Sequence, residues 1–228
     1  RQEKYQTNMR AYFRMISGID HVVGRLVAEL KKQGLAENTV IIYTADNGYY
    51  LGDRGFAGKW THYDESLRVP LIVHDPRLPE SKQGKVVTEM ALNSDLASTM
   101  IDLADLPVPQ AHTGRSLAPL IGGKEVSGWR KDFLCEFLAV PGTIPRWEGV
   151  RGEHMTYARY FVNGPSEPPY EFLFDLKNDP KQLTNLARKK SCHPLLQRMR
   201  NRCDELVAET GPAMKEVGET RRKSTKKK

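Results

Sequence analysis

Long apolar runs and paired cysteines are absent from this sequence. No stretch approaches the 18 consecutive apolar residues of a membrane-spanning helix, so we expect no membrane partner. The three cysteines, Cys135, Cys192 and Cys203, form no CxxC pair, which leaves a structural zinc site unsupported. An odd number leaves at least one thiol unpaired, and a bridge between Cys192 and Cys203 stays open. No internal repeat is visible.

An initiating methionine and a signal peptide are also absent. The chain opens on Arg1 and enters a helical pattern almost at once. We therefore expect the chain to be part of a longer protein, so the missing leader does not argue against export.

The excess of positive charge is concentrated in a tail. The formal net charge is +7, and residues 213–228 hold seven basic and two acidic side chains, which leaves +2 for the rest. This distribution predicts a solvated, disordered basic tail rather than a nucleic-acid-binding surface. We expect no nucleic-acid partner; weak contact with an anionic polymer is the alternative.

Hydrophobic periodicity predicts an α/β domain followed by a small α+β subdomain. Apolar residues recur at helical spacing from Met9 to Leu30, and residues 40–45 then read as a strand buried on both faces of a parallel sheet. A second strand at 70–73 and a helix at 94–106 follow. Beyond residue 123 the pattern predicts an antiparallel sheet with one helix packed on it. Its elements are strands 133–138, 157–162 and 171–176 and a helix over 193–209. We expect the domains to span 1–123 and 124–212, with the tail at 213–228.

Candidate chemistry follows the first strand. Asp46 and Asn47 offer a carboxylate and an amide oxygen, the hard donors that suit Ca²⁺ or Mg²⁺. Lys59, on a glycine-rich loop, could reach an anion bound to that metal. Two donors do not complete a metal site, and Asp46-Asn47-Gly48 is also an ordinary turn.

A series of motifs in order along the chain gives this stretch a context. The first is Thr44-Ala45-Asp46-Asn47-Gly48, and Gly58-Lys59 and Tyr63-Asp64-Glu65-Ser66-Leu67-Arg68-Val69-Pro70 follow it. Further along stand Asp95-Leu96-Ala97-Ser98-Thr99, Gly114-Arg115-Ser116-Leu117, Phe174-Asp175-Leu176 and Thr184-Asn185-Leu186. Over roughly residues 5–210 this order resembles the C-terminal portion of formylglycine-dependent sulfatases of the alkaline-phosphatase superfamily, especially bacterial polysaccharide sulfatases. Ser98 stands where that family usually has proline.

The resemblance implies roles for individual residues. Asp46 and Asn47 match two metal ligands, usually for calcium, with Mg²⁺ the less expected ion. Lys59 matches the lysine that contacts the sulfate and its leaving-group oxygen. His62 is a candidate substrate contact, although a surface-loop histidine is the favoured description. The family further implies a sulfated saccharide or other sulfate ester as substrate and a periplasmic or secreted location.

The nucleophile of that family is not found in this sequence. Its formylglycine forms from Cys or Ser in a Cys/Ser-x-Pro-x-Arg motif, which neither Cys135 nor Cys192 satisfies. Ser166 fails as well, because Tyr170 stands at the arginine position. We expect the motif upstream of Arg1, together with further metal ligands, and we expect this chain to be inactive alone.

Three functions stay open at this point. The first is a sulfuric-ester hydrolase. The second is a phosphate or phosphonate ester hydrolase of the same superfamily, and the third is a non-catalytic pseudoenzyme or binding module. Trp60, Trp129 and Trp147 are expected in a core or interface. Trp147 and Arg146 could instead border a saccharide site.

Overall fold

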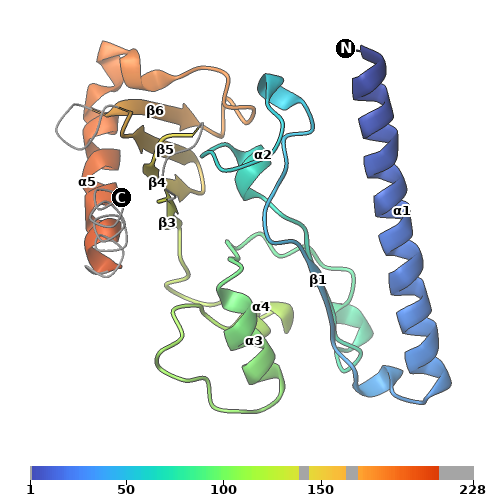
Figure 1. Cartoon of the computed structure of the whole chain (residues 1–228). Helices are drawn as coiled ribbons and strands as arrows, with labels where there is room; N and C mark the ends of the chain where they lie inside the picture. The colour runs from blue at the N-terminus through green and yellow to red at the C-terminus, as the bar shows by residue number, and fades with distance from the viewer. Residues whose placement is uncertain (1, 139–143, 163–168, 211–228) are drawn as a thin grey trace, which may run out of the picture. The chain divides into compact units, whose positions relative to one another are not determined.

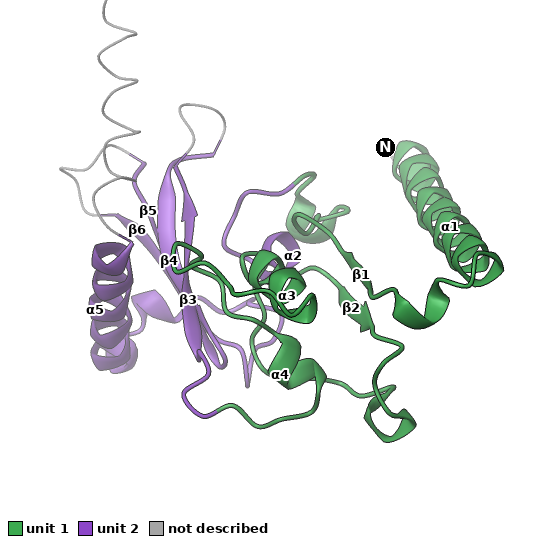
Figure 2. Cartoon of the chain, turned by 90° about the horizontal axis from the view of Figure 1, so that it is seen from below, with its two compact units in different colours: residues 1–58, 68–126 green, residues 59–67, 127–228 purple. Residues whose placement is uncertain are grey.

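Two compact units make up the chain. The computed structural model describes residues 2–138, 144–162 and 169–210, so the predicted basic tail lies outside the described residues. The first unit holds residues 1–58 and 68–126, and the second holds residues 59–67 and 127–228 (Figure 2). Residues 59–67, which the sequence assigned to the first domain, are thus grouped with the C-terminal part of the chain.

The first unit begins with one long helix and a two-stranded sheet. Helix α1 spans Gln2–Lys32, and the short turn that follows it carries Gly34 at a φ of +70°. Glycine suits that turn because it adopts positive φ at little cost. Strand β1 (Ile41–Thr44) follows (Figure 1) and pairs with β2 (Leu71–His74) (Figure 2).

The sheet of the first unit differs from its prediction. Strands β1 and β2 pair antiparallel, with Ile41 opposite His74, where the sequence pattern predicted a parallel sheet. Neither strand is buried on both faces, since Tyr43 and Ile72 are exposed. The apolar run of β1 misled the prediction because local sequence does not reveal which layers cover a strand. Among the described residues, only these two strands pair in this unit.

Two short helices complete the first unit. Helix α3 spans Asp95–Leu103, which confirms the helix predicted at 94–106, and α4 spans Ala118–Ile121. The amphipathic helix predicted near the N-terminus is confirmed as α1, but none of its residues is buried. Among the described residues, no helix is both long enough and apolar enough to cross a membrane.

The second unit is a four-stranded antiparallel sheet with a helix packed on it. Strands β3 (Asp132–Phe137), β4 (Trp147–Gly152), β5 (Met155–Tyr160) and β6 (Tyr170–Asp175) are ordered as they occur along the chain (Figure 2). Helix α5 spans His193–Glu209, which confirms the predicted helix at both ends, and it contacts β3, β4 and β5. The predicted antiparallel sheet with one helix is therefore confirmed.

Different segments of the chain cover the two faces of this sheet. Strand residues Val150, Tyr157 and Leu173 form one buried cluster with Leu196, Cys203 and Leu206 of α5. The opposite face carries Cys135, Trp147, Ala158 and Tyr160, and Leu67 packs against it. Leu67 ends the short helix α2 (Asp64–Leu67), which belongs to the segment 59–67. The alternation of side chains along each strand thus places α5 on one face and this segment on the other.

Strand β4 is absent from the sequence prediction. Its sequence, Trp147-Glu148-Gly149-Val150-Arg151-Gly152, contains two glycines and two charges, which are poor strand formers. The fold requires the first glycine, because a Cβ at Gly149 would lie 2.2 Å from the carbonyl oxygen of Tyr157. The charges have partners: Arg159 binds the buried Glu148 through Nε at 2.8 Å and Nη2 at 2.6 Å. Tertiary contacts therefore override the weak local preference.

Candidate functional site

The candidate metal ligands directly follow the end of β1. The Asp46 carboxylate oxygen Oδ1 accepts a hydrogen bond from the backbone N–H of Asn47 at 2.9 Å. The Asn47 amide nitrogen Nδ2 donates to the carbonyl oxygen of Gly48 at 2.8 Å. That bond orients the amide group, because it places the nitrogen toward Gly48 and the oxygen Oδ1 on the other side. Asp46 is exposed and Asn47 half-buried.

One side chain that the sequence did not single out fixes the backbone of this turn. Asn93 Nδ2 donates to the carbonyl oxygens of Ala45 and Asp46, each at 3.1 Å. Both oxygens belong to the peptide units that flank the Asp46 side chain. Asn93 lies two residues before the start of α3, next to the Asp95–Thr99 motif. Its place beside that motif is the sequence feature that could have identified it. We regard Asn93 as a residue that positions the turn.

A buried carboxylate in turn holds the segment that carries Asn93. Asp95 is fully buried, and its Oδ2 and Oδ1 accept the backbone N–H groups of Leu92 and Arg115, each at 2.8 Å. Thr99 Oγ1 donates to the carbonyl oxygen of Asp95 at 2.7 Å and accepts the N–H of Leu117 at 2.9 Å. The Asp95–Thr99 and Gly114–Leu117 motifs are therefore partners in one hydrogen-bonded structure rather than reacting groups.

The glycine of the second motif is sterically required. A Cβ on Gly114 would lie 1.9 Å from the carbonyl oxygen of Ser94, closer than any real contact. Ser98 stands where the family that the sequence resembles usually has proline. Its side chain is fully buried, and its Oγ donates a hydrogen bond to the carbonyl oxygen of Gly114 at 2.9 Å. The substitution thus adds a bond to the same structure.

Lys59 is the first residue of the segment 59–67, which belongs to the second unit. Its neighbour Trp60 has a φ of +84°, a left-handed conformation that is unusual for a bulky residue. The Trp60 N–H donates to Ser66 Oγ at 2.9 Å, and its carbonyl oxygen accepts from Trp147 Nε1 at 2.8 Å. Such a conformation costs about 1–3 kcal/mol and persists only when surrounding contacts impose it. The two bonds supply that constraint directly beside Lys59.

Trp147 and Trp60, two of the three tryptophans expected in a core or interface, differ in exposure. Trp147 is 2% exposed and lies in the core, whereas Trp60 is 51% exposed. Trp147 therefore cannot border a saccharide site in this structure, because its ring is enclosed and its Nε1 is committed to Trp60. Its neighbour Arg146 stacks its guanidinium over the Phe161 ring at 5.8 Å.

His62 is not positioned to touch a substrate, which corrects its assignment as a substrate contact. Its side chain is 1% exposed, and its ring lies 4.5 Å from the Phe172 ring, centroid to centroid. Nδ1 and the Tyr160 hydroxyl are 2.8 Å apart, and the His62 N–H donates to the same hydroxyl at 3.3 Å. Loop position suggested exposure, but the aromatic side chains of β5 and β6 enclose the ring. His62 anchors the segment instead.

An ion pair completes the attachment of this segment. Arg151 of β4 donates to both carboxylate oxygens of Asp64, from Nε at 2.8 Å and from Nη2 at 3.0 Å. The Asp64 N–H donates to Gln182 Oε1 at 2.9 Å. Both of these partners of Asp64 lie more than 80 residues away along the chain. Bidentate, half-buried pairs of this kind constrain geometry more than exposed pairs do.

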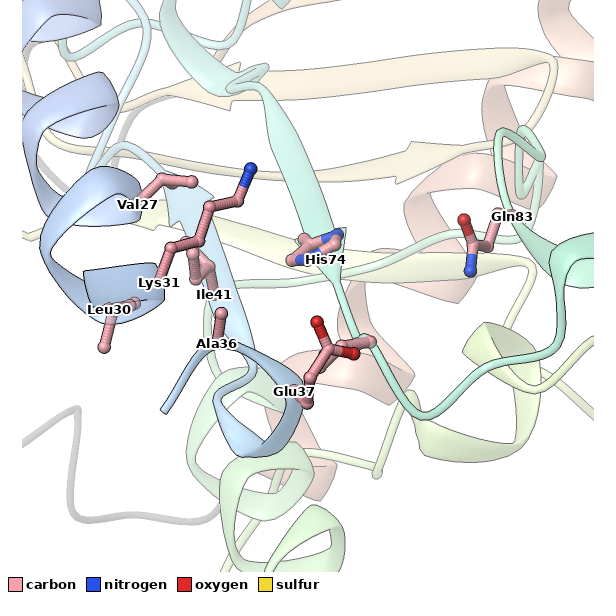
Figure 3. A pocket seen from close by; sticks show the side chains of 9 residues that line it. Val27, Leu30, Lys31, Ala36, Glu37, Ile41, His74 and Gln83 are labelled. Carbon is pink, nitrogen blue, oxygen red and sulfur yellow. The ribbon is translucent and has the colours of Figure 1, made fainter. Parts of the chain in front are cut away.

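An open hollow in the first unit lies away from these residues. It has a volume of about 310 Å³ and is lined by Val27, Leu30, Lys31, Ala36, Glu37, Ile41, His74, Pro76 and Gln83 (Figure 3). Ile41 begins β1, whereas Asp46 follows its other end. The hollow is therefore at the opposite end of the strand from the candidate ligands, and we assign it no role in the chemistry.

Comparison with known proteins decides the family. A family model described as N-sulphoglucosamine sulphohydrolase, C-terminal, matches residues 52–209. An N-acetylglucosamine-6-O-sulfatase of Bacteroides thetaiotaomicron is 34% identical over 190 residues, covering 82% of this chain and 33% of the relative. The chain belongs to the sulfatase family. An arylsulfatase of Clostridium perfringens is 32% identical over 190 residues, covering 79% of this sulfatase chain and 36% of the relative.

Solved structures agree with the sequence relatives. A protein in complex with its substrate D-glucosamine-2-N,6-O-disulfate superposes with a TM-score of 0.81 and 28% identity, covering 93% of this sulfatase chain and 42% of that chain. A phosphonate monoester hydrolase of Agrobacterium radiobacter gives a TM-score of 0.74 and 26% identity, covering 86% and 40%. The sulfatase chain spans about a third of the length of the curated relatives it matches.

The oxygen donors present fit part of a hard-cation site. Asp46 and Asn47 supply a carboxylate and a carbonyl oxygen on a turn whose backbone is fixed by Asn93. No group of three or more His, Cys, Asp or Glu side chains that could hold a metal occurs within residues 2–138, 144–162 and 169–210. This sulfatase chain thus offers, among its described residues, two neighbouring donors of suitable chemistry. Sulfatases as a family imply a metal and a formylglycine.

Proposed function

We propose that the protein to which this chain belongs hydrolyses sulfate esters of saccharides, with Asp46, Asn47 and Lys59 in its active site. The main observation behind this proposal is the match to sulfatases, which extends over both units and includes an N-acetylglucosamine-6-O-sulfatase. The fixed turn at Asp46 supports it, because a metal site needs ligands whose positions do not relax.

Each residue has a distinct part in this proposal. Asp46 contributes a charged ligand and Asn47 a neutral one to a calcium ion, which when bound offsets the negative charge of the sulfate. Lys59 donates a hydrogen bond to the oxygen that joins sulfur to the sugar, and it stabilises the charge that develops there as the S–O bond breaks. Calcium rather than Mg²⁺ is proposed because backbone-fixed, irregular oxygen sets suit the larger ion.

A phosphate or phosphonate ester hydrolase is the second candidate. The structural likeness to a phosphonate monoester hydrolase favours it, and a metal with a lysine would stabilise either anion. The curated sequence relatives at 30% identity or more include sulfatases with saccharide and aryl substrates in their names, and these favour the sulfate ester.

The test uses the full-length protein and three substitutions. Asp46→Ala should lower both calcium content and sulfate release, because it removes a charged ligand; Asn47→Ala should do the same more weakly. Lys59→Ala should retain calcium and slow the reaction by about 10²–10³-fold, the usual effect of losing one charge-stabilising donor. The loss should be greater for N-acetylglucosamine 6-O-sulfate than for an activated aryl sulfate, whose leaving group needs less help.

The readouts are metal content by mass spectrometry and sulfate release by ion chromatography. The competing substrate is the phenyl monoester of phenylphosphonate, whose hydrolysis is followed by the release of phenol. Asp53→Ala and Lys85→Ala serve as controls that remove an exposed carboxylate and an exposed amine. Wild-type rates for Lys59→Ala on both sulfates would refute its role. Full calcium occupancy in Asp46→Ala would refute the metal assignment, and a preference for the phosphonate would favour the second candidate.

A further inference from the structure

Trp60 departs from the pattern of the aromatic residues around it. On its face of the sheet the aromatic side chains of Trp147, Tyr160 and Phe174 are buried, and each stacks on a neighbouring aromatic ring. Trp60 follows Lys59 in the chain, yet about half of its side-chain surface is exposed. Its ring lies 6.5 Å from the Phe137 ring, centroid to centroid, and is tilted by 39° to it.

The backbone at Trp60 is held in a conformation that tryptophan itself disfavours. The N–H and the carbonyl oxygen are bound to Ser66 and Trp147 of the second unit, and φ is +84°. Glycine would meet the same backbone requirement without strain, and a polar residue would meet the exposure without leaving apolar surface in water. Local preferences that conflict with the fold in this way tend to occur at functional positions.

We propose that the Trp60 indole is a stacking platform for the sugar ring whose sulfate ester is bound at Lys59. The inference rests on the proposed function and adds a subsite to it. A pyranose ring presents an apolar C–H face, which an exposed indole can cover, while the neighbouring ammonium group of Lys59 attracts the sulfate. An aromatic ring and a cation on consecutive residues therefore match the two halves of a sulfated saccharide.

This assignment exchanges the roles expected for two tryptophans. Trp147 was the sequence candidate for stacking on a sugar, and Trp60 was expected in a core or interface. In the structure the buried Trp147 holds the carbonyl oxygen of Trp60. Trp147 thus acts through Trp60, which is the ring that remains accessible.

The experiment compares Trp60→Ala, Trp60→Gly and Trp60→Phe in the full-length protein. The measured quantities are KM and kcat for N-acetylglucosamine 6-O-sulfate and for D-glucosamine-2-N,6-O-disulfate, and the inhibition constant of inorganic sulfate. Sulfate occupies the anion site without a sugar, so its inhibition constant reports on that site without any contact to the sugar ring. Tyr170→Ala removes a second exposed ring of the same unit and is the matched control.

Trp60→Ala should raise KM for the saccharides by about 10-fold, the scale of one aromatic contact, and leave inhibition by sulfate unchanged. Trp60→Phe should recover part of the loss. Trp60→Gly should bind the saccharides as weakly as Trp60→Ala but melt at a higher temperature, because glycine relieves the left-handed strain. Tyr170→Ala should keep the wild-type KM.

Three results would overturn the subsite. An unchanged KM in an active Trp60→Ala enzyme would remove it and leave the proposed function standing. A parallel rise in KM and in the inhibition constant of sulfate would show that Trp60 only supports the Lys59 segment. A wild-type protein that releases no sulfate from either saccharide would instead refute the proposed function, and the subsite with it.

Discussion

Individual side chains that take no part in the chemistry hold the backbone of the candidate site. Asn93 bonds to the carbonyl oxygens on both sides of the Asp46 side chain, and Trp147 bonds to the carbonyl oxygen next to Lys59. Backbone carbonyls in a turn have no strand or helix partners of their own, so one amide or indole N–H can decide their direction. In the proposed site, ligand geometry would therefore depend on residues outside the proposed ligand set.

The effect of Asn93 can be measured directly. Asn93→Ala removes both bonds and should weaken calcium binding by the full-length protein by about 10-fold, since each net bond is worth about 0.5–1.5 kcal/mol and the site is exposed. Asn93→Asp keeps the shape but removes the donor, and it should behave like the alanine variant. Titration calorimetry with calcium checks this, with Asn201→Ala in α5 as control. An unchanged calcium affinity in Asn93→Ala would refute the positioning role.

Helix α5 and strand β6 show how charged pairs fix one element on another. Glu171 accepts hydrogen bonds from the Tyr157 hydroxyl and from Arg200 Nε, each at 2.7 Å. Burial alone would raise the pKa of Glu171, but the bonds from Arg200 and Tyr157 outweigh it and hold that pKa below its usual value. The same contacts raise the pKa of Arg200. The packing of α5 against β6 thus favours the charged form of Glu171.

The lowered pKa of Glu171 predicts a pH dependence of defined sign. A carboxylate whose pKa is lower in the folded state stabilises the fold above its unfolded pKa, near 4.5, and loses that contribution as pH falls through the folded value. The melting temperature of the second unit should therefore drop on acidification below about pH 4.5. Glu171→Gln should flatten this part of the profile, whereas Glu205→Gln, at an exposed position, should not. Parallel profiles for Glu171→Gln and wild type would contradict the prediction.

The two units of the chain differ in how far their helices and strands are buried. The second unit has a sheet covered on one face by α5 and on the other by the segment 59–67. In the first unit, none of the residues of α1, β1 or β2 is buried. All three cysteines are free thiols, and all lie in the second unit. Thiol chemistry therefore reports on that unit alone.

Thiol labelling tests the integrity of the second unit. Burial raises the pKa of Cys135 and of Cys203 to about 12, so neither forms the reactive thiolate at pH 8 while the unit is folded. Cys192 is half-buried and should react first. Iodoacetamide should modify one thiol quickly and the other two only across the urea transition, as followed by mass spectrometry. Rapid modification of all three in native buffer would contradict the packing of α5 on the sheet.

The sequence by itself determined the family, the helices α1, α3 and α5, and most of the C-terminal sheet. Helix α5 and the strands β3, β5 and β6 follow from local periodicity, because alternation and helical spacing are properties of consecutive residues. The ordered motifs indicated the sulfatase resemblance for the same reason. Asp46, Asn47 and Lys59 were found through those motifs, and their roles stay predictions.

Only the tertiary structure decided which side chains face solvent and which are enclosed. His62 and Trp60 exchange their expected environments, since contacts from β4, β5 and β6 bury one and turn the other outward. The Asp64–Arg151 pair depends on a partner far along the chain, and so does the bond from Asn93 to the Asp46 turn. Burial and hydrogen-bond partners are set by packing between segments that are distant in sequence. A local sequence pattern does not identify the distant residue that packs against it.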